Sequence, residues 1–152
     1  MFTPDATDRR ILAMLQSDAA LSIAELAERV GLSQTPCWKR IKRLEEAGVI
    51  TGRVALLDRT QLGVGTTVFV SVRTSQHDEN WLTGFAEAIR AIPEVTEFYR
   101  MSGDVDYLLK IVCRDIADYD RIYKTMIRAA KLSDVSSSFA MEQIKYTTEV
   151  PL

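Results

Sequence analysis

Four basic side chains lie within five consecutive residues, and their chemistry suits the binding of phosphate. They are Lys39, Arg40, Lys42 and Arg43, in a chain of 152 residues whose formal net charge is -2. Cationic side chains attract the phosphates of nucleic acids through local charge, so a slightly acidic protein can still carry such a site. A basic helix face is also compatible with simple solvation, so charge alone leaves both interpretations open.

Other residues that do chemistry are few and scattered. Cys37 and Cys113 have the spacing of neither a metal site nor a disulfide framework, and the single histidine, His77, has no obvious partner. Asp104 and Asp106 alternate on an expected strand, which points their carboxylates to opposite faces. Without a nucleophile–base pair or a set of metal ligands, the sequence predicts a protein that is not an enzyme and uses no cofactor or metal.

Two helices are expected before the basic cluster. The first covers residues 6–17, with Asp5 or Thr7 as the N-cap, since either side chain can accept the free amides of a first helical turn. The second begins at Ser22, which forms a capping-box pattern with Glu25, and it ends at a glycine.

The basic cluster falls on a third helix, which begins with Ser33 or Thr35 as its N-cap and ends before Gly48. Its apolar stripe, at spacing i, i+4 and i+7, consists of Cys37, Ile41 and Leu44. Two helices joined by a short glycine-containing turn form a helix-turn-helix, whose second helix enters the major groove of DNA. Positive charge is then concentrated where phosphates will lie.

The segment VITGRVALL after the third helix predicts a short strand or hairpin. The arrangement is then a winged helix-turn-helix, with Arg53 near the wing. Trp38 has two interpretations: it stacks on the sugar–phosphate backbone, or it packs against the other domain or a partner subunit.

A compact α+β unit follows a polar, glycine-containing linker at residues 58–65. The expected elements are a strand over 66–73, a helix over 82–92, strands over 95–101 and 105–113, a helix over 115–127 and a strand over 135–146. Their order, βαββαβ, is that of the ferredoxin-like fold. The fold class is therefore α+β, with a DNA-binding domain at residues 1–57 and a second domain at residues 66–152.

Two helices can cover only one face of a four-stranded sheet. The other face is left with side chains such as Phe69, Tyr99 and Phe139. A bare apolar face of this size must be buried, most simply against a second copy. The sequence therefore predicts a homodimer, whose symmetry presents two helix-turn-helix units to a two-fold DNA site.

The composition, with 47% hydrophobic and 26% charged residues, is that of a globular protein. No segment approaches the roughly 20 apolar residues that span a bilayer, and the N-terminus MFTPDATDRR has no secretory pattern. The expected location is therefore cytoplasmic, with no membrane partner. Residues 1–60 hold nine Lys/Arg against eight Asp/Glu, and residues 61–152 hold ten against thirteen, so the half with the basic cluster is the basic half.

Three stretches, DRRILAMLQSD, ELAERVGLSQTPCWKRIKRLEEAGVI and SGDVDYLLKI, resemble the leucine-responsive/AsnC (Lrp/AsnC) family of transcription regulators. The resemblance covers nearly the whole chain, in the right order and spacing. It implies an N-terminal winged helix-turn-helix, a C-terminal ferredoxin-like domain called RAM, and dimers that assemble into octamers or related rings. It also implies a small effector, usually an amino acid, that binds between dimers. Pro4 stands where the family usually has Leu, so the entry to the first helix departs from the pattern.

The resemblance implies site residues position by position. The recognition helix is matched by Ser33, Gln34, Thr35, Pro36, Trp38, Lys39, Arg40, Lys42 and Arg43. Those expected to face the groove are Gln34, Thr35, Trp38 and Lys39, and those expected to lean towards phosphates are Arg40, Lys42 and Arg43. The effector pocket is matched by Arg100, Met101, Ser102, Gly103, Asp104, Asp106, Ser138, Phe139 and Ala140.

The expected pocket has a physical rationale. The ammonium of an amino acid needs an acceptor, which Asp104 or Asp106 can supply, and its carboxylate needs donors, which the amides around Ser102 and Gly103 can supply. A glycine also lets a ligand approach the backbone closely. The same residues can simply make a hairpin turn.

These observations predict an amino-acid-responsive transcription regulator that binds double-stranded DNA. The alternative is an architectural DNA-binding protein of the same fold that needs no effector. Because a ligand of the native state must stabilise it, the binding of amino acids distinguishes the two.

Overall fold

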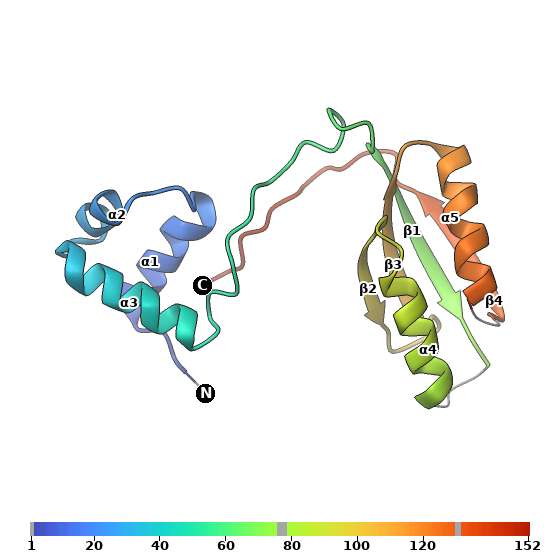
Figure 1. Ribbon diagram of the computed structural model, residues 1–152, viewed down its shortest axis with the longest axis horizontal. Helices are drawn as coiled ribbons and strands as arrows, with labels where there is room; N and C mark the ends of the chain where they lie inside the picture. Colours follow the sequence, from blue (N-terminus) through green and yellow to red (C-terminus); the bar gives the residue numbers. More distant parts are fainter. Residues whose placement is uncertain (1, 76–78, 130–131) are drawn as a thin grey trace. The chain divides into compact units, whose positions relative to one another are not determined.

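In the computed structural model, which describes residues 2–75, 79–129 and 132–152, the chain forms two compact units (Figure 1). The first unit is Met1–Leu56 together with Lys145–Leu152, and the second is Leu57–Ile144. The second unit also takes in Leu57 and residues 58–65, which were predicted as the end of the first domain and the linker. The 145–152 segment, which the sequence assigned to the C-terminal domain, packs with the N-terminal unit.

Three helices build the first unit: α1 (Ala6–Ser17), α2 (Ile23–Val30) and α3 (Gln34–Glu46). A capping box opens α1, in which the Asp5 carboxylate accepts the amides of Thr7 and Asp8 while the Asp8 carboxylate accepts the amide of Asp5. Asp5 is therefore the N-cap. The buried apolar side chains of the three helices form one cluster: Ile11, Leu12, Leu26, Ala27, Val30, Cys37, Ile41 and Leu44.

The predicted limits of α2 are confirmed. The Ser22 hydroxyl accepts the Glu25 amide at 3.2 Å, and the Glu25 carboxylate accepts the Ser22 amide at 2.9 Å. Gly31 closes the helix in the left-handed region, at φ +71°, where a residue with a side chain is strained. The chain then turns into α3, as a helix-turn-helix requires.

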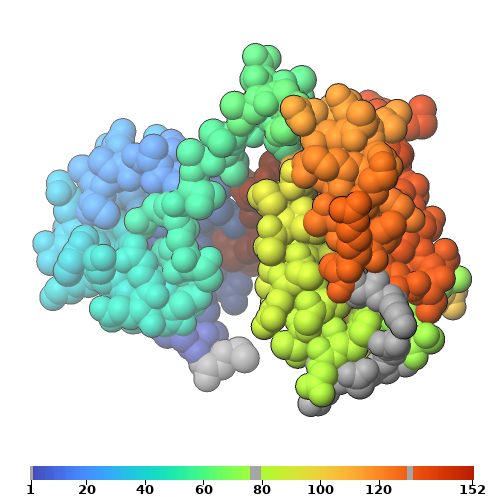
Figure 2. Space-filling model, turned by 45° about the vertical axis from the view of Figure 1, so that its right-hand side comes forward, coloured from blue at the N-terminus to red at the C-terminus, as the bar shows by residue number. Residues whose placement is uncertain are grey.

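Within this chain the segment after α3 forms no strand, where the sequence predicted a short strand or hairpin. The amides of Val49 and Ile50 turn back to the Leu44 carbonyl, at 2.9 and 3.1 Å. The chain then continues as exposed, irregular backbone (teal in Figure 2), with no strand assigned over residues 51–57. A strand needs a neighbour for its amides and carbonyls, and no described part of this chain forms a ladder with these residues.

The 145–152 segment packs on the end of α1. The Gln16 carboxamide forms two bonds with the Val150 backbone, donating to its carbonyl at 3.0 Å and accepting from its amide at 3.1 Å. The Ser17 hydroxyl donates to the Glu149 carboxylate at 2.7 Å. Residues separated by more than 130 positions in the chain therefore complete one unit.

The second unit contains β1 (Thr66–Arg73), α4 (Glu79–Arg90), β2 (Val95–Arg100), β3 (Tyr107–Cys113), α5 (Ile116–Ala129) and β4 (Asp134–Phe139). All strand pairs are antiparallel and the order is β2-β3-β1-β4, which confirms the predicted ferredoxin-like plan. The last strand ends before the predicted residue 146. The last backbone bond of the β1–β4 pair, from the Ala140 amide to the Thr67 carbonyl, lies one residue from the start of β1 at Thr66.

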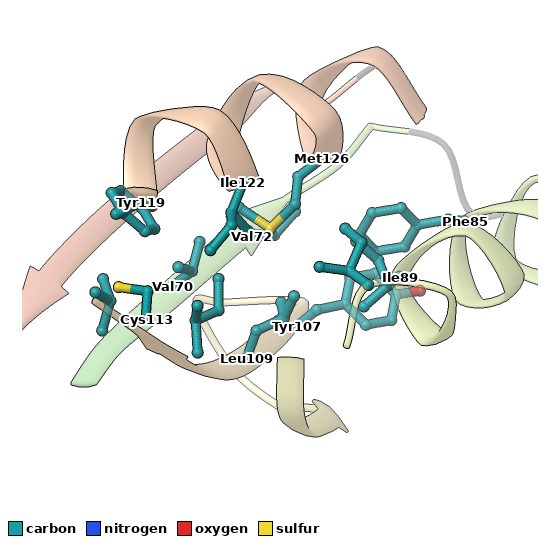
Figure 3. Packing of buried hydrophobic residues seen from close by; sticks show 13 residues of the cluster. Val70, Val72, Phe85, Ile89, Tyr107, Leu109, Cys113, Tyr119, Ile122 and Met126 are labelled. Carbon is teal, nitrogen blue, oxygen red and sulfur yellow. The ribbon is translucent and has the colours of Figure 1, made fainter. Parts of the chain in front are cut away.

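The core of the second unit lies between the sheet and the two helices α4 and α5 (Figure 3). The inward side chains of β1 are Val68, Val70 and Val72, and α5 contributes Tyr119, Ile122 and Met126. From α4, Phe85 packs edge-on against Tyr107, with ring centroids 5.5 Å apart. The helices therefore cover one face of the sheet and leave the other face open.

Phe69 and Tyr99 lie on that open face and are partly exposed, as predicted. The prediction for Phe139 is wrong. Its register pairs it with Val68, which is buried on the helix side, and its ring meets Tyr119 edge-on at 5.3 Å. Because side chains alternate along a strand, this pairing places Phe139 under α5.

Candidate functional site

The outward face of α3 carries most of the residues expected to bind DNA. The buried stripe Cys37, Ile41 and Leu44 holds one side of the helix against the unit. The exposed residues are Ser33, Gln34, Thr35, Pro36, Trp38, Lys39, Lys42 and Arg43. Eight of the nine expected helix positions are therefore accessible to solvent, and Arg40, which is half-buried, is the exception.

The N-terminus of α3 is left open, unlike those of α1 and α2. Ser33 occupies the N-cap position with extended backbone, but its hydroxyl accepts no amide of the helix. The first turn then has free N–H groups at Gln34 and Thr35, and Pro36 has none. Free amides at a helix N-terminus attract anions, so this end is suited to a phosphate or a base edge.

Arg40 is turned towards α1 rather than outward. Its Nη1 donates to Asp5 Oδ2 and to Asp8 Oδ1, both at 2.7 Å. This bond to Arg40, and then the bond from the Asp8 amide, lowers the pKa of Asp5 from 3.8 to about 2. Arg40 therefore joins α3 to α1, and its expected lean towards phosphates is not what the structure shows.

Arg43 shares the same carboxylate but remains accessible. Its Nη2 donates to Asp8 Oδ2 at 2.7 Å, and its guanidinium lies over the Phe2 ring, 5.2 Å from the centroid. Half of the Arg43 side chain is exposed, against 29% for Arg40, whereas the Asp8 side chain is fully buried. The two arginines thus differ in what they present to solvent.

A third carboxylate partly neutralises the basic side chains near the C-terminal end of α3. Glu45 pairs with Lys42 at 2.8 Å and with Arg53 at 3.1 Å, and Lys42 is the main cause that lowers the pKa of Glu45. Lys39 forms no ion pair with any residue that the structure describes. Asp5 was expected only as a cap, and neither Asp8 nor Glu45 was expected at this surface, although all three carboxylates pair with its cations.

The expected effector residues between β2 and β3 form a hairpin turn. The Met101 amide donates to the Asp106 carbonyl at 2.8 Å, and Gly103 has φ +117°, which favours glycine. Arg73 Nε donates to the Asp104 carbonyl at 2.7 Å. Arg100 and Ser102 are exposed beside them.

Asp106 is used by the fold. Its Oδ2 accepts the Thr74 amide at 2.8 Å, and its own amide donates to the Val72 carbonyl at 3.0 Å. The Asp104 side chain is exposed and forms no ion pair with a described residue. Of the two carboxylates considered for an ammonium group, Asp104 is therefore the available one.

The other expected effector residues, Ser138, Phe139 and Ala140, lie elsewhere on the same sheet. Phe139 pairs with Val68, whereas the hairpin turn meets β1 at Val72 and Arg73. Val68 and Arg73 are five positions apart along β1, which is roughly 16 Å. Within one chain the two halves of the expected pocket are therefore not brought together.

Two cavities lie elsewhere. One, of about 750 Å³, is between the end of α5 and β4, and one of about 310 Å³ is in the first unit, between α1, the segment after α3 and the 145–152 segment. Neither contains an expected effector residue, and Arg53 lines the smaller one.

Cys37 and Cys113 are buried free thiols, and burial raises the pKa of each. His77 lies outside the described residues. Among residues 2–75, 79–129 and 132–152, no group of three or more His, Cys, Asp or Glu side chains could hold a metal ion. In the same part of the chain, every helix is too short or too polar to cross a bilayer.

Two family models match this chain, one on each unit. Residues 4–51 match a winged helix-turn-helix DNA-binding model, and residues 67–150 match the Lrp/AsnC ligand-binding domain. Among characterised proteins, the chain is 49% identical to the DNA-binding transcriptional activator DecR of Escherichia coli, covering 97% of this chain and 98% of DecR. It is also 49% identical to the glutamate uptake regulatory protein of Zymomonas mobilis, covering 97% and 90%.

Solved structures resemble the chain along its whole length. An AsnC family transcriptional regulator from Agrobacterium tumefaciens has a TM-score of 0.94 and 59% identity, covering 97% of this chain and 96% of that one. The transcriptional regulator NMB0573 of Neisseria meningitidis, solved as a complex with L-Met, has a TM-score of 0.92 and 35% identity, covering 98% and 97%.

Proposed function

The chain belongs to the Lrp/AsnC family of DNA-binding transcription regulators, and on that premise we propose that it binds two-fold DNA as a homodimer and responds to an amino acid. The observation that carries the proposal is the outward face of α3. It combines an open helix N-terminus, exposed polar side chains and cations on one side of a helix-turn-helix.

The proposed DNA contacts follow from this surface. Gln34, Thr35 and the first-turn amides reach base edges or a phosphate, with Ser33 and Pro36 beside them. Trp38 and Lys39 lie further along the side of α3 that faces the groove. Lys42, Arg43 and Arg53 contact the phosphates at the edges of the groove. Arg40 is left out of this set, because its guanidinium already donates to Asp5 and Asp8 at the start of α1.

The open face of the sheet supports the proposed dimer. Phe69 and Tyr99 expose apolar surface there, and Lys110 and Glu97 pair with each other at 2.6 Å, which lowers the cost of burying their charges. A second copy covers this face by two-fold symmetry. Further association into an octamer or a related ring places the hairpin turn of one dimer beside another dimer.

The proposed effector site lies at that junction. The exposed Asp104 carboxylate accepts the ammonium, and the amides around Ser102 and Gly103 donate to the carboxylate. Arg100 and Met101 border the turn, while Asp106 holds it in place. Because Ser138 and Ala140 lie about 16 Å away along β1, they complete the pocket from a different subunit, with Phe139 supporting them from beneath α5. NMB0573 in its complex with L-Met makes L-methionine the first amino acid to test.

Binding to DNA is expected to depend steeply on salt. If Lys39, Lys42, Arg43 and Arg53 each neutralise one phosphate in both subunits, the logarithm of the affinity falls with the logarithm of salt concentration with a slope of about -7. The measurement is fluorescence anisotropy of a labelled mixed-sequence duplex between 50 and 200 mM salt. Binding that stays constant over this range would contradict the phosphate contacts.

Response to an amino acid is expected to depend on Asp104. Thermal unfolding is measured with L-methionine and then with each other proteinogenic amino acid, since a ligand at 100 times its Kd stabilises the native state by about 2.7 kcal/mol. The Asp104→Ala variant should lose the shift in Tm and keep its affinity for DNA. Asp120→Ala, which removes an exposed carboxylate on α5, is the matched control. If no amino acid shifts the wild-type protein, the architectural function is favoured.

A further inference from the structure

A buried carboxylate lies directly behind the surface proposed to bind DNA. Asp8 Oδ1 accepts Arg40 Nη1 at 2.7 Å, and Oδ2 accepts Arg43 Nη2 at 2.7 Å and the Asp5 amide at 3.1 Å. Its side chain is fully buried although it belongs to the first turn of α1. We propose that Asp8 is a positioning residue for DNA binding, which holds Arg43 ready for a phosphate. This inference rests on the proposed function.

The geometry of α3 separates the roles of the two arginines. With 100° per residue, Lys39 lies almost opposite the buried stripe of Cys37, Ile41 and Leu44, and Arg43 lies one turn further on, close to the same line. Arg40 lies about 60° from the stripe, on the side that faces α1. The helix therefore points Arg43 towards the DNA side and Arg40 towards the interior.

The two arginines also differ in the carboxylates with which they form ion pairs. Arg40 forms ion pairs with both Asp5 and Asp8, whereas Arg43 forms an ion pair with Asp8 alone among the residues that the structure describes. Asp5 therefore compensates much of the charge of Arg40, and the carboxylate of Asp8 is shared between two cations. The two guanidiniums and the two carboxylates sum to zero charge, so what Arg43 offers a phosphate is its N–H groups that Asp8 does not occupy, held in a fixed place.

Phe2 completes the support for Arg43. The guanidinium lies 5.2 Å from the centre of its ring, which is within the range of a cation–π contact. An exposed arginine normally loses rotamer freedom when it binds a phosphate. Asp8 and Phe2 already restrict the guanidinium in the free protein, so Arg43 loses less rotamer entropy when it binds a phosphate. The smaller entropy loss favours binding.

The test is a double-mutant cycle between Asp8 and Arg43, read out as affinity for a labelled 30-base-pair mixed-sequence duplex at several salt concentrations. Removing a negative charge near DNA would ordinarily strengthen binding. We expect the reverse for D8N: affinity lower by roughly tenfold and a salt slope smaller by about one for each subunit bound. R43Q should show the same changes, and the double variant should bind no more weakly than R43Q alone.

Asp5→Asn is the matched control, because Asp5 contacts Arg40 but not Arg43. It should leave the salt slope unchanged. Tighter binding by D8N, or effects of D8N and R43Q that simply add, would overturn the inference. Failure of the wild-type protein to bind the duplex would instead overturn the proposed function.

Circular dichroism at the assay temperature shows whether D8N is folded. If it is not, Phe2→Leu replaces it in the measurement, since leucine keeps the apolar packing and removes the ring. Its salt slope should also be smaller than that of the wild-type protein, and an unchanged slope would overturn the inference.

Discussion

Replacing Phe69 with Asp is expected to convert the protein to a monomer and to weaken its binding to a two-fold DNA site by more than about 100-fold. Phe69 lies on the open face of the central strand β1, with 39% of its surface exposed in the single chain. An aspartate there would be buried without a partner in a symmetric interface, at high cost. A monomer holds only one half-site, so it loses the gain in affinity that comes from linking two binding units.

Analytical ultracentrifugation gives the mass, and anisotropy with a palindromic duplex gives the affinity. Ile127→Asp is the matched control, because Ile127 is 41% exposed but lies on α5, in the layer away from the open face. A Phe69→Asp protein that remains a dimer would place the interface elsewhere. Equal dissociation of both variants would show only that added charge is harmful.

Replacing Phe85 with Ala is expected to lower the free energy of unfolding of the second unit by about 3–5 kcal/mol. The side chain is almost fully buried between α4 and the sheet (Figure 3). Its ring packs against three others, Trp81, Phe98 and Tyr107, at centroid distances of 5.1 to 5.7 Å. Alanine would leave a cavity that these rings cannot fill without changing their own packing.

Urea unfolding, monitored by circular dichroism, measures this loss. Ile116→Ala is a suitable control, because Ile116 begins α5 with most of its side chain in solvent and should change stability by less than about 0.5 kcal/mol. A loss of under about 1 kcal/mol for Phe85→Ala would mean that the core repacks around the gap.

Features that depend on neighbours in sequence could be predicted from the sequence. The capping box of Ser22 and Glu25, the stop at Gly31 and the buried stripe of α3 each need only a few adjacent residues. The order of strands and helices follows from alternation and periodicity, and the ferredoxin-like topology follows from that order.

Features that depend on distant partners could not be predicted in the same way. Arg40 and Asp8 are 32 positions apart, and nothing near Arg40 in sequence shows that its partner lies on α1. The sequence favours a strand up to residue 146, but β4 ends at Phe139, opposite Val68 and close to the start of β1 at Thr66. The side of the sheet that Phe139 occupies depends on its register with Val68, which alternation alone does not determine.

The packing of the 145–152 segment on α1 has a consequence for biosynthesis. A domain at the start of a chain generally folds first as it leaves the ribosome. Here the Gln16 carboxamide and the Ser17 hydroxyl acquire their partners, Val150 and Glu149, only after all of the second unit has been translated. The first unit to emerge is therefore the last to be completed, so a nascent chain finishes its helix-turn-helix unit only after the whole four-stranded sheet of the second unit has been translated.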